Sequence, residues 1–423
     1  MLPEGTMATE EKLMVDDRFK YLRRMKGRYA RASREERSQL LDEMEAFTGM
    51  HRKSLIRSMN SDVKRKPRRR QRGSTYGPEV RDALRVISRG LDGICAERLT
   101  PNLVWLAQHM AAHDELDVSQ DLLEKLERIS VSTVKRILRS VCQDRPRLPR
   151  RRPKQRSNWL SDVPMKRIPW DLEEPGHFEV DLVHHCGPTA AGEYVCTIQM
   201  IDVATGWSER VAVLGRSYLV MRDGFHRILD RLPFPVREIH PDNGSEFFNN
   251  HMRRFWNEKL QGLQLSRSRP YHKNDNRFVE QKNSTLVRAY LGYDRFDTVA
   301  QTQAANVLYD RMWLFYNFFQ PVMRMTEKII DRASEDNTFR VKRRYDNART
   351  PFDRLCATEA ISDHLQDQLE MLRAQTSIIQ LREEIYRLMD SLFALPNATP
   401  GNTEDVFLTL TADLFNYPQE VST

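Results

Sequence analysis

Three acidic residues, Asp181, Asp242 and Glu280, have the residue type and setting for metal-dependent chemistry. They are separated by 61 and 38 residues. Asp181 lies within HFEVDLVHH (177–185), whose alternating apolar residues predict a strand. Asp242 follows an apolar run and precedes Asn243-Gly244, which indicates a strand ending in a tight turn. Three carboxylates that converge from two strands and a helix can bind hard divalent cations such as Mg²⁺.

The third acid, Glu280, is expected about one and a half turns into a helix that Asn274 or Asp275 can cap. Two further acids near the first strand, Glu179 and Asp202, are not expected to belong to the candidate set. Glu179 shares the sheet face of Asp181 but lies about 7 Å along the strand. Asp202 precedes a hairpin turn, and we expect it to hydrogen-bond to its own backbone.

The elements that must position these acids are strands alternating with helices. Strands are predicted at 193–203, 207–214, 236–242 and 263–268, and helices at 217–232 and 249–260. A meander followed by alternating strands and helices predicts a mixed sheet with helices on its faces. Residues 298–321 read as a core helix, 339–355 as a basic segment that could contact DNA, and 358–395 as helical, for a bundle or for oligomerisation.

Composition places the chain among ordinary globular proteins. It has 423 residues, of which 40% are hydrophobic and 30% charged, enough for two or three domains. Apolar runs are shorter than the ~18 residues of a membrane span, and we expect no membrane association and no secretory leader. The five cysteines are scattered without a CxxC pair, which fits a reducing compartment such as the cytoplasm.

Positive charge is concentrated in the first part of the chain. Residues 1–160 hold 36 Lys and Arg against 22 Asp and Glu, whereas the remainder is mildly acidic. The tract 64–72 carries seven basic residues, including Arg68, Arg69 and Arg70, and no apolar residue. This tract predicts a linker that contacts nucleic acid phosphates, with a solvated tether as the alternative. A second Pro/Arg linker is expected at 143–164.

A first helical pair is predicted in 1–63. A capping box, Ser33 and Glu36, opens a helix whose inward face would hold Leu40, Leu41, Met44 and Phe47. Thr48-Gly49 ends it, and a short helix follows with Leu55, Ile56 and Met59 inward and Arg52, Lys53 and Arg57 outward. This plan is typical of a helix-turn-helix DNA-binding domain, although a plain helical hairpin with a basic face fits equally.

A second helical block is predicted at 79–142. Its last helix carries Ser132, Thr133, Lys135 and Arg136, and these are candidate groove contacts of a second helix-turn-helix domain. The alternative is a packing helix of a small bundle.

The motifs of the central region resemble those of the DDE transposase and integrase superfamily, in particular bacterial insertion-sequence transposases with an integrase-type core. The matching segments are EVDLVHHCG (179–187), IDVATGW (201–207), HPDNGSEF (240–247), RSRPYHKNDNRFVEQKN (267–283), LGYDR (291–295) and FFQP (318–321). The segment 274–277 departs from retroviral integrases, which usually carry a glycine there. The resemblance covers about 170–355.

This resemblance implies a multidomain fold: N-terminal all-α helix-turn-helix domains, an α/β ribonuclease-H-like catalytic core with a mixed five-stranded sheet at 165–330, and a mostly helical C-terminal region at 331–423. It also implies two Mg²⁺ ions, replaceable by Mn²⁺. Asp181 would bridge both ions, Asp242 would complete one site and Glu280 the other.

Further side chains are candidates around this site. Asn243 and His185 are expected to support it, and Asn283 matches an asparagine of integrases one turn past the glutamate. Lys273, Arg277 and Lys282 are candidate phosphate contacts, although solvated charges would look the same. Zinc at His184, His185 and Cys186 is disfavoured, since a single short run seldom forms a closed site.

The sequence therefore predicts a DNA transposase that binds the terminal repeats of a mobile element and cuts and joins strands. Its partners would be those repeats and target DNA, and it would act as at least a dimer, in the bacterial cytoplasm at the nucleoid. Two alternatives remain open: a transposase-derived DNA-binding regulator without catalysis, and a ribonuclease-H-like nuclease that only cuts.

Overall fold

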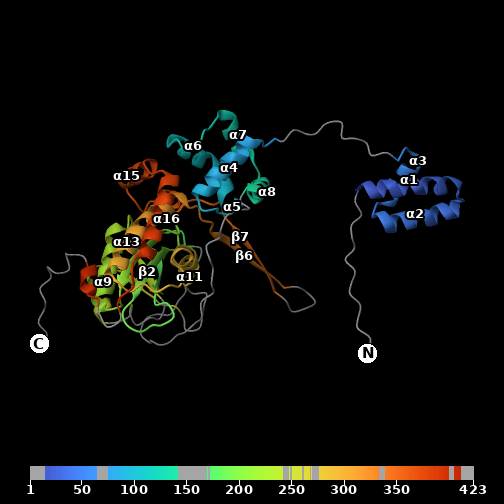
Figure 1. Cartoon of the computed structure of the whole chain (residues 1–423). Coiled ribbons are helices and arrows are strands. Elements are labelled where there is room, and N and C mark those ends of the chain that lie inside the picture. Colours follow the sequence, from blue (N-terminus) through green and yellow to red (C-terminus); the bar gives the residue numbers. More distant parts are fainter. Residues whose placement is uncertain are drawn as a thin grey trace, which may run out of the picture. The chain divides into compact units, whose positions relative to one another are not determined.

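The computed structural model describes residues 15–63, 75–141, 169, 172–241, 247, 250–259, 262–266, 268, 276–332, 339–399 and 404–410. The chain divides into two compact units, Met1–Thr75 and Tyr76–Thr423 (Figure 1). Within the described residues, every helix is too short or too polar to cross a bilayer.

The first unit is a three-helix domain of α1 (Val15–Arg31), α2 (Arg34–Thr48) and α3 (Arg52–Asn60). The predicted capping box is present, because the Ser33 amide donates to Glu36 Oε2 at 2.7 Å and the Glu36 amide donates to Ser33 Oγ. Gly49 ends α2 with a φ of 65°, a left-handed conformation that glycine adopts without steric cost. The two predicted helices of this region are therefore confirmed.

Helix α1 was not predicted, and it changes which side chains are buried. Its Leu22 and Met25 join Met44 and other apolar residues of α2 and α3 in a small core. Two expectations are wrong: Phe47 is 51% exposed and Ile56 is 36% exposed. The Phe47 ring instead contacts Tyr21 at the surface, with 4.3 Å between centroids. A three-helix core of this size has room for only one face of each short helix.

The second unit begins with a helical block. It comprises α4 (Pro78–Gly90), α5 (Ala96–Leu99), the 3₁₀ turn η1 (Thr100–Asn102), α6 (Leu103–Ala112), α7 (Gln120–Arg128) and α8 (Val131–Val141). This block packs into the unit that contains the sheet. Asn102 Nδ2 donates to the Ala348 carbonyl at 3.0 Å, and Gln320 Nε2 donates to the Leu91 carbonyl at 3.0 Å.

The central sheet has five strands in the order β3-β2-β1-β4-β5. These are β1 (His177–His184), β2 (Val195–Asp202), β3 (Ser208–Leu214), β4 (Glu238–Pro241) and β5 (Gln264–Leu265). β1, β2 and β3 are antiparallel neighbours, whereas β4 is parallel to β1 and to β5. The predicted mixed five-stranded sheet is confirmed, with a fifth strand shorter than expected.

Helices cover both faces of the sheet. On one face α9 (Tyr218–Arg231) approaches so closely that a Cβ at Gly224 would lie 2.6 Å from the Ile198 side chain. Glycine is required at this crossing. The opposite face lies under α13 (Val299–Leu314), where Tyr309 bonds to Thr197, the neighbour of Ile198 on β2. α10 (Asn250–Lys259) packs beside α9.

The chain between β5 and α13 supplies the remaining helix on the α13 face. α11 (Arg277–Lys282) runs without interruption into the π-helical segment η2 (Asn283–Arg288) and α12 (Ala289–Leu291). π-helical turns inside α-helices are rare and are frequent at functional sites.

The C-terminal part is more varied than expected. A π-helical turn, η3 (Phe315–Phe319), ends the predicted long core helix, and a two-stranded ribbon of β6 (Met325–Arg332) and β7 (Phe339–Tyr345) follows. Helices α14 (Pro351–Cys356), α15 (Asp363–Ala374) and α16 (Ile378–Ala394) and the 3₁₀ turn η4 (Val406–Thr409) complete the described chain. The helices at 358–395 are confirmed, whereas the ribbon was not predicted.

Candidate active site

The acids of β1 lie on the sheet face that α11 and α13 cover. Register pairs Asp181 with Gln199 of β2, and strand alternation puts Glu179 on the same face. Asp181 is half-buried, and its Oδ1 accepts a hydrogen bond from the Leu182 amide at 2.8 Å. Glu179 is 1% exposed. Two carboxylates on one face of one strand therefore differ in their access to solvent.

Helix α11 is joined to β1 by its last turn. Asn283 Nδ2 donates to Asp181 Oδ2 at 2.5 Å, although 102 residues separate the two. Glu280 precedes Asn283 by three residues, so the two share one side of the helix. Glu280 is exposed. The contact brings the helix that carries one predicted acid against the strand that carries another.

The first turn of α11 is also bound to β1, through Glu179. Its Oε2 accepts hydrogen bonds from the Phe278 amide at 2.7 Å and from the Val279 amide at 3.0 Å. Those amides have no partner within the helix, and a carboxylate also interacts favourably with the positive end of the helix dipole. Asn274 and Asp275, the expected caps, lie outside the described residues, and the N-cap residue is Asn276, which makes no side-chain cap bond. Glu179 fills that role.

Strand β4 lies beside β1 and ends directly before Asp242 in the sequence. Its last described residue, Pro241, precedes Asp242, and register pairs Pro241 with Val180, the residue that precedes Asp181. Asp242 and Asn243 themselves lie outside the described residues. The described part of β4 therefore ends opposite the middle of β1, next to Asp181.

Two polar groups beside Asp181 have no partner among the described residues. One is the side-chain amide of Gln199, which is fully buried on β2 opposite Asp181 and whose nitrogen and oxygen both lack a partner in the described part of the chain. The other is Oδ1 of Asn283. A buried polar atom without a hydrogen bond costs free energy. Carboxylate and amide oxygens are the ligands that Mg²⁺ prefers, so the donor set at Asp181, Asn283 and Glu280 fits a hard cation. Among the described residues, which exclude Asp242, no three acidic, histidine or cysteine side chains form a ligand cluster.

Comparison with known proteins places the chain in a family. No protein-family model matches it. A protein of Sinorhizobium fredii, described as uncharacterized protein y4rM, is 36% identical over 302 residues, which span 71% of this chain and 86% of the relative. The chain belongs to the family of y4rM. Since the relative's description states no activity, membership of the y4rM family assigns none.

Two solved structures show distant similarity. The catalytic core domain of BIV integrase is 15% identical, with a TM-score of 0.24 over 34% of this chain and 83% of that chain. A chain of the simian T-cell lymphotropic virus intasome, in complex with PP2A regulatory subunit B56 gamma, is 13% identical, with a TM-score of 0.28 over 51% of this chain and 69% of that one. Both scores are too low to support an inference about the y4rM family.

His185, expected to support the site, lies in the core. Its Nε2 contacts Thr197 Oγ1 at 2.9 Å, and Thr197 Oγ1 in turn contacts the Tyr309 hydroxyl at 2.6 Å. Burial, together with Arg288 and His184, lowers the pKa of His185 to about 3. A neutral, fully buried imidazole joins β1, β2 and α13 and has no access to solvent.

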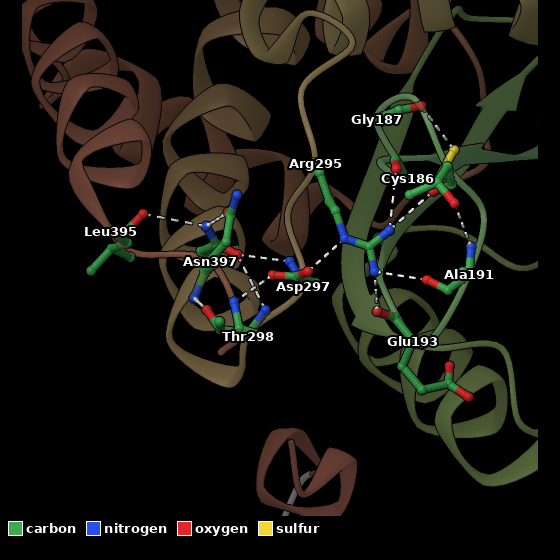
Figure 2. A network of polar contacts seen from close by, with 12 residues as sticks. Cys186, Gly187, Ala191, Glu193, Arg295, Asp297, Thr298, Leu395 and Asn397 are labelled. Carbon is green, nitrogen blue, oxygen red and sulfur yellow. Dashed lines mark hydrogen bonds and ion pairs between the residues drawn. The ribbon is translucent and has the colours of Figure 1, made fainter. Parts of the chain in front are cut away.

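The loop between β1 and β2 is held by Arg295 of the LGYDR segment (Figure 2). Its guanidinium donates to the backbone carbonyls of Cys186, Thr189, Ala191 and Glu193 at 2.9–3.2 Å, and it pairs with Asp297 at 2.5 Å. Asp297 Oδ1 also accepts from the Ala398 amide at 2.8 Å. One arginine therefore connects the end of β1 to the C-terminal segment.

The remaining basic candidates of the core lie in different settings. Lys282 is half-buried, and burial together with Arg98 and Arg210 lowers its pKa to about 7. Arg277 lies in the first turn of α11, where only the backbone is described, and Lys273 lies outside the described residues. Arg288 donates to the His184 carbonyl at 2.8 Å.

The candidates in the helical regions are mostly exposed. Lys53 and Arg57 are exposed on α3, whereas Arg52 is half-buried and binds Asp42 and Ser38 of α2. On α8, Ser132, Lys135 and Arg136 are exposed, Thr133 is half-buried, and Lys135 pairs with Glu97 at 3.2 Å. Arg68, Arg69 and Arg70 lie outside the described residues.

Sequence reasoning missed one residue of this site, the capping carboxylate of Glu179. Its signal is the Glu-Val-Asp spacing, since two acids at i and i+2 of a strand share a face. That spacing alone does not say which acid meets a helix and which meets solvent. The docking of α11 distinguishes them.

Proposed function

We propose that this protein is a DNA transposase that binds the terminal repeats of a mobile element and catalyses metal-dependent strand cleavage and strand transfer. The observation that carries the proposal is the contact between Asn283 and Asp181. It joins the helix that carries Glu280 to the strand that carries Asp181, and β4, which is followed by Asp242, pairs with that strand.

The sheet supports the same proposal. An antiparallel meander of three strands, with β4 parallel to the first and β5 beyond it, is the arrangement implied by a ribonuclease-H-like core. In this arrangement an acid in β1 and an acid just after β4 occupy neighbouring strands. Asp242 follows Pro241, whose partner is the residue before Asp181.

Asp181, Asp242 and Glu280 would hold two Mg²⁺ ions, or Mn²⁺ in their place. Bound cations would stabilise charge on the attacking and leaving oxygens of the phosphodiester. Asn283 orients the Asp181 carboxylate by donating to its Oδ2, and Glu179 fixes the first turn of α11, the helix that carries Glu280.

Recognition of DNA is proposed for the helical regions. The exposed row of Ser132, Lys135 and Arg136 on α8, and Lys53 and Arg57 on α3, suit a helix placed in a major groove. Joining two element ends to one target requires at least a dimer, and the cytoplasmic nucleoid would be its place of action.

The test is strand transfer of terminal-repeat DNA into a plasmid in Mg²⁺ or Mn²⁺. Asp181→Asn and Glu280→Gln should each reduce the rate by on the order of 10³-fold or more, with binding of the end DNA unchanged. Asp367→Asn, on the exposed surface of α15, is the matched control and should retain full activity.

Full activity in either acid variant would contradict the proposal. Binding of end DNA by the wild type without cleavage or joining would instead indicate a DNA-binding regulator. Cleavage without joined products would indicate a nuclease.

A further inference from the structure

The β6–β7 ribbon is anchored firmly at its base. The Asp346 amide donates to the Arg324 carbonyl at 2.9 Å, and the Arg324 amide donates to Asp346 Oδ1 at 2.7 Å. Arg354 of α14 pairs with Asp346 Oδ2 at 2.7 Å, and Val322 and Arg349 form an antiparallel bridge. The ribbon is therefore fixed to the α14 region at the point where its two strands meet the rest of the unit.

Neither strand of the ribbon joins the five-stranded sheet within the described residues (Figure 1). Seven register pairs connect β6 and β7, which corresponds to roughly 20 Å of paired strand. Near the base, the side chains of Lys342, Arg343, Arg344 and Tyr345 are exposed. A ribbon of this width and length can enter the major groove of duplex DNA.

Register separates the charges of the ribbon into two faces. On one face, named the paired face, Asp331 lies opposite Arg340 and Glu327 opposite Arg344. Glu327 and Arg344 form an ion pair of 2.8 Å. Lys342, opposite Ile329, completes this face.

The other face, named the basic face, carries positive charge without an acid. Lys328 lies opposite Arg343, and Arg332 lies opposite Phe339. Ile330 and Val341 lie between them. By register, this face therefore carries three basic residues and no acidic one, a charge pattern that suits a polyanion.

We propose that the basic face of the β6–β7 ribbon binds the phosphate backbone of duplex DNA as a contact separate from the helical regions. This inference rests on the proposed function. A polyanion with regularly spaced phosphates complements the positive charge of this face, and Tyr345, which is 50% exposed, gives the same face an aromatic surface. The contact is to the backbone and is therefore independent of DNA sequence.

The experiment compares two double variants of the full chain that remove the same charge. Lys328→Ala with Arg343→Ala alters the basic face, and Arg340→Ala with Lys342→Ala alters the paired face. Binding to a 30-base-pair duplex is measured by anisotropy as a function of salt concentration, beside strand transfer. The basic-face variant should bind at least about tenfold more weakly at low salt, and its log–log salt slope should fall by about 1.8. The paired-face variant should change much less.

Equal effects in the two variants, or wild-type binding in the basic-face variant, would overturn the inference. The inference would also be overturned if the basic-face variant lost affinity for an RNA duplex but not for the DNA duplex. Failure of the proposed function gives a different result: the wild type would show the ribbon-dependent binding without strand transfer. If the variants bind and transfer strands as the wild type does, the ribbon inference fails and the proposed function stands.

Discussion

Two pairs of acids, three of them on the central sheet and Glu280 on α11, have opposite surroundings. Asp202 and Glu179 are fully buried, and their oxygens accept hydrogen bonds from backbone amides. Asp181 is half-buried and Glu280 is exposed. In one pair the carboxylates complete the fold, and in the other they keep access to solvent.

The difference shows how structural acids can be separated from candidate active-site acids. Asp202 accepts from Gly176, from the Thr205 amide and from the Thr205 hydroxyl at 2.6–2.8 Å. Burial raises its pKa, and these hydrogen bonds lower it by a smaller amount. Asp202 uses its oxygens for buried protein donors and is therefore a poor metal ligand, whereas Asp181 is half-buried and lies beside the end of β4.

The comparison is tested most strongly at Asp202. Asp202→Ala leaves three buried donors without an acceptor and should lower the free energy of unfolding by about 3–5 kcal/mol. Asp181→Ala should lower it by less than about 1 kcal/mol while abolishing strand transfer. Urea unfolding followed by tryptophan fluorescence measures the Tyr76–Thr423 unit alone, because all six tryptophans lie in it.

Equal destabilisation by the two substitutions would remove the distinction between structural and active-site acids at this sheet. Full strand transfer by the Asp181→Ala protein would also remove this distinction.

A second prediction concerns Glu179. Glu179→Ala leaves the Phe278 and Val279 amides without an acceptor and should cost about 2–4 kcal/mol, with a loss of strand-transfer rate. Glu179→Gln keeps an oxygen acceptor and should recover most of the stability and rate. Parallel urea unfolding and single-turnover strand transfer on both variants provide the measurement.

If Glu179→Gln were as inactive as Asp181→Asn yet fully stable, Glu179 would act in the reaction itself rather than as the cap of α11.

The smallest predicted effect is the pH response of His185. Its folded pKa of about 3 lies below the ordinary value of 6.5, so the unfolded chain binds a proton more readily. The stability it contributes is therefore present above pH 6.5 and is lost as pH falls from 6.5 toward 3. As pH falls from 7 to 5, His185 should lower the free energy of unfolding by about 2 kcal/mol.

His185→Gln serves as the comparison. Between pH 7 and pH 5, its free energy of unfolding should fall by about 2 kcal/mol less than that of the wild type. Identical pH profiles for the two proteins would show that His185 is not held neutral in the core.

The amino-acid sequence alone determined the local elements of this protein. Alternation along 177–185 specifies β1, the Ser33–Glu36 capping box specifies the start of α2, and Gly49 specifies its end. Each depends on residues a few positions apart, so short-range sterics and hydrogen bonding are sufficient. The three candidate acids were also recognisable, since each lies within a distinctive run of neighbouring residues.

Only the tertiary structure decided how the surroundings of the individual acids differ. Glu179 and Asp181 share a strand face, and their different roles arise from the way α11 meets β1, across about 100 residues of intervening chain. The β6–β7 ribbon was missed for a related reason. Charged residues make up about half of both strands, so no long apolar run marks them, and contacts at Asp346 anchor the base of the ribbon. Contacts between distant segments depend on how whole elements pack, and no short stretch of sequence contains that information.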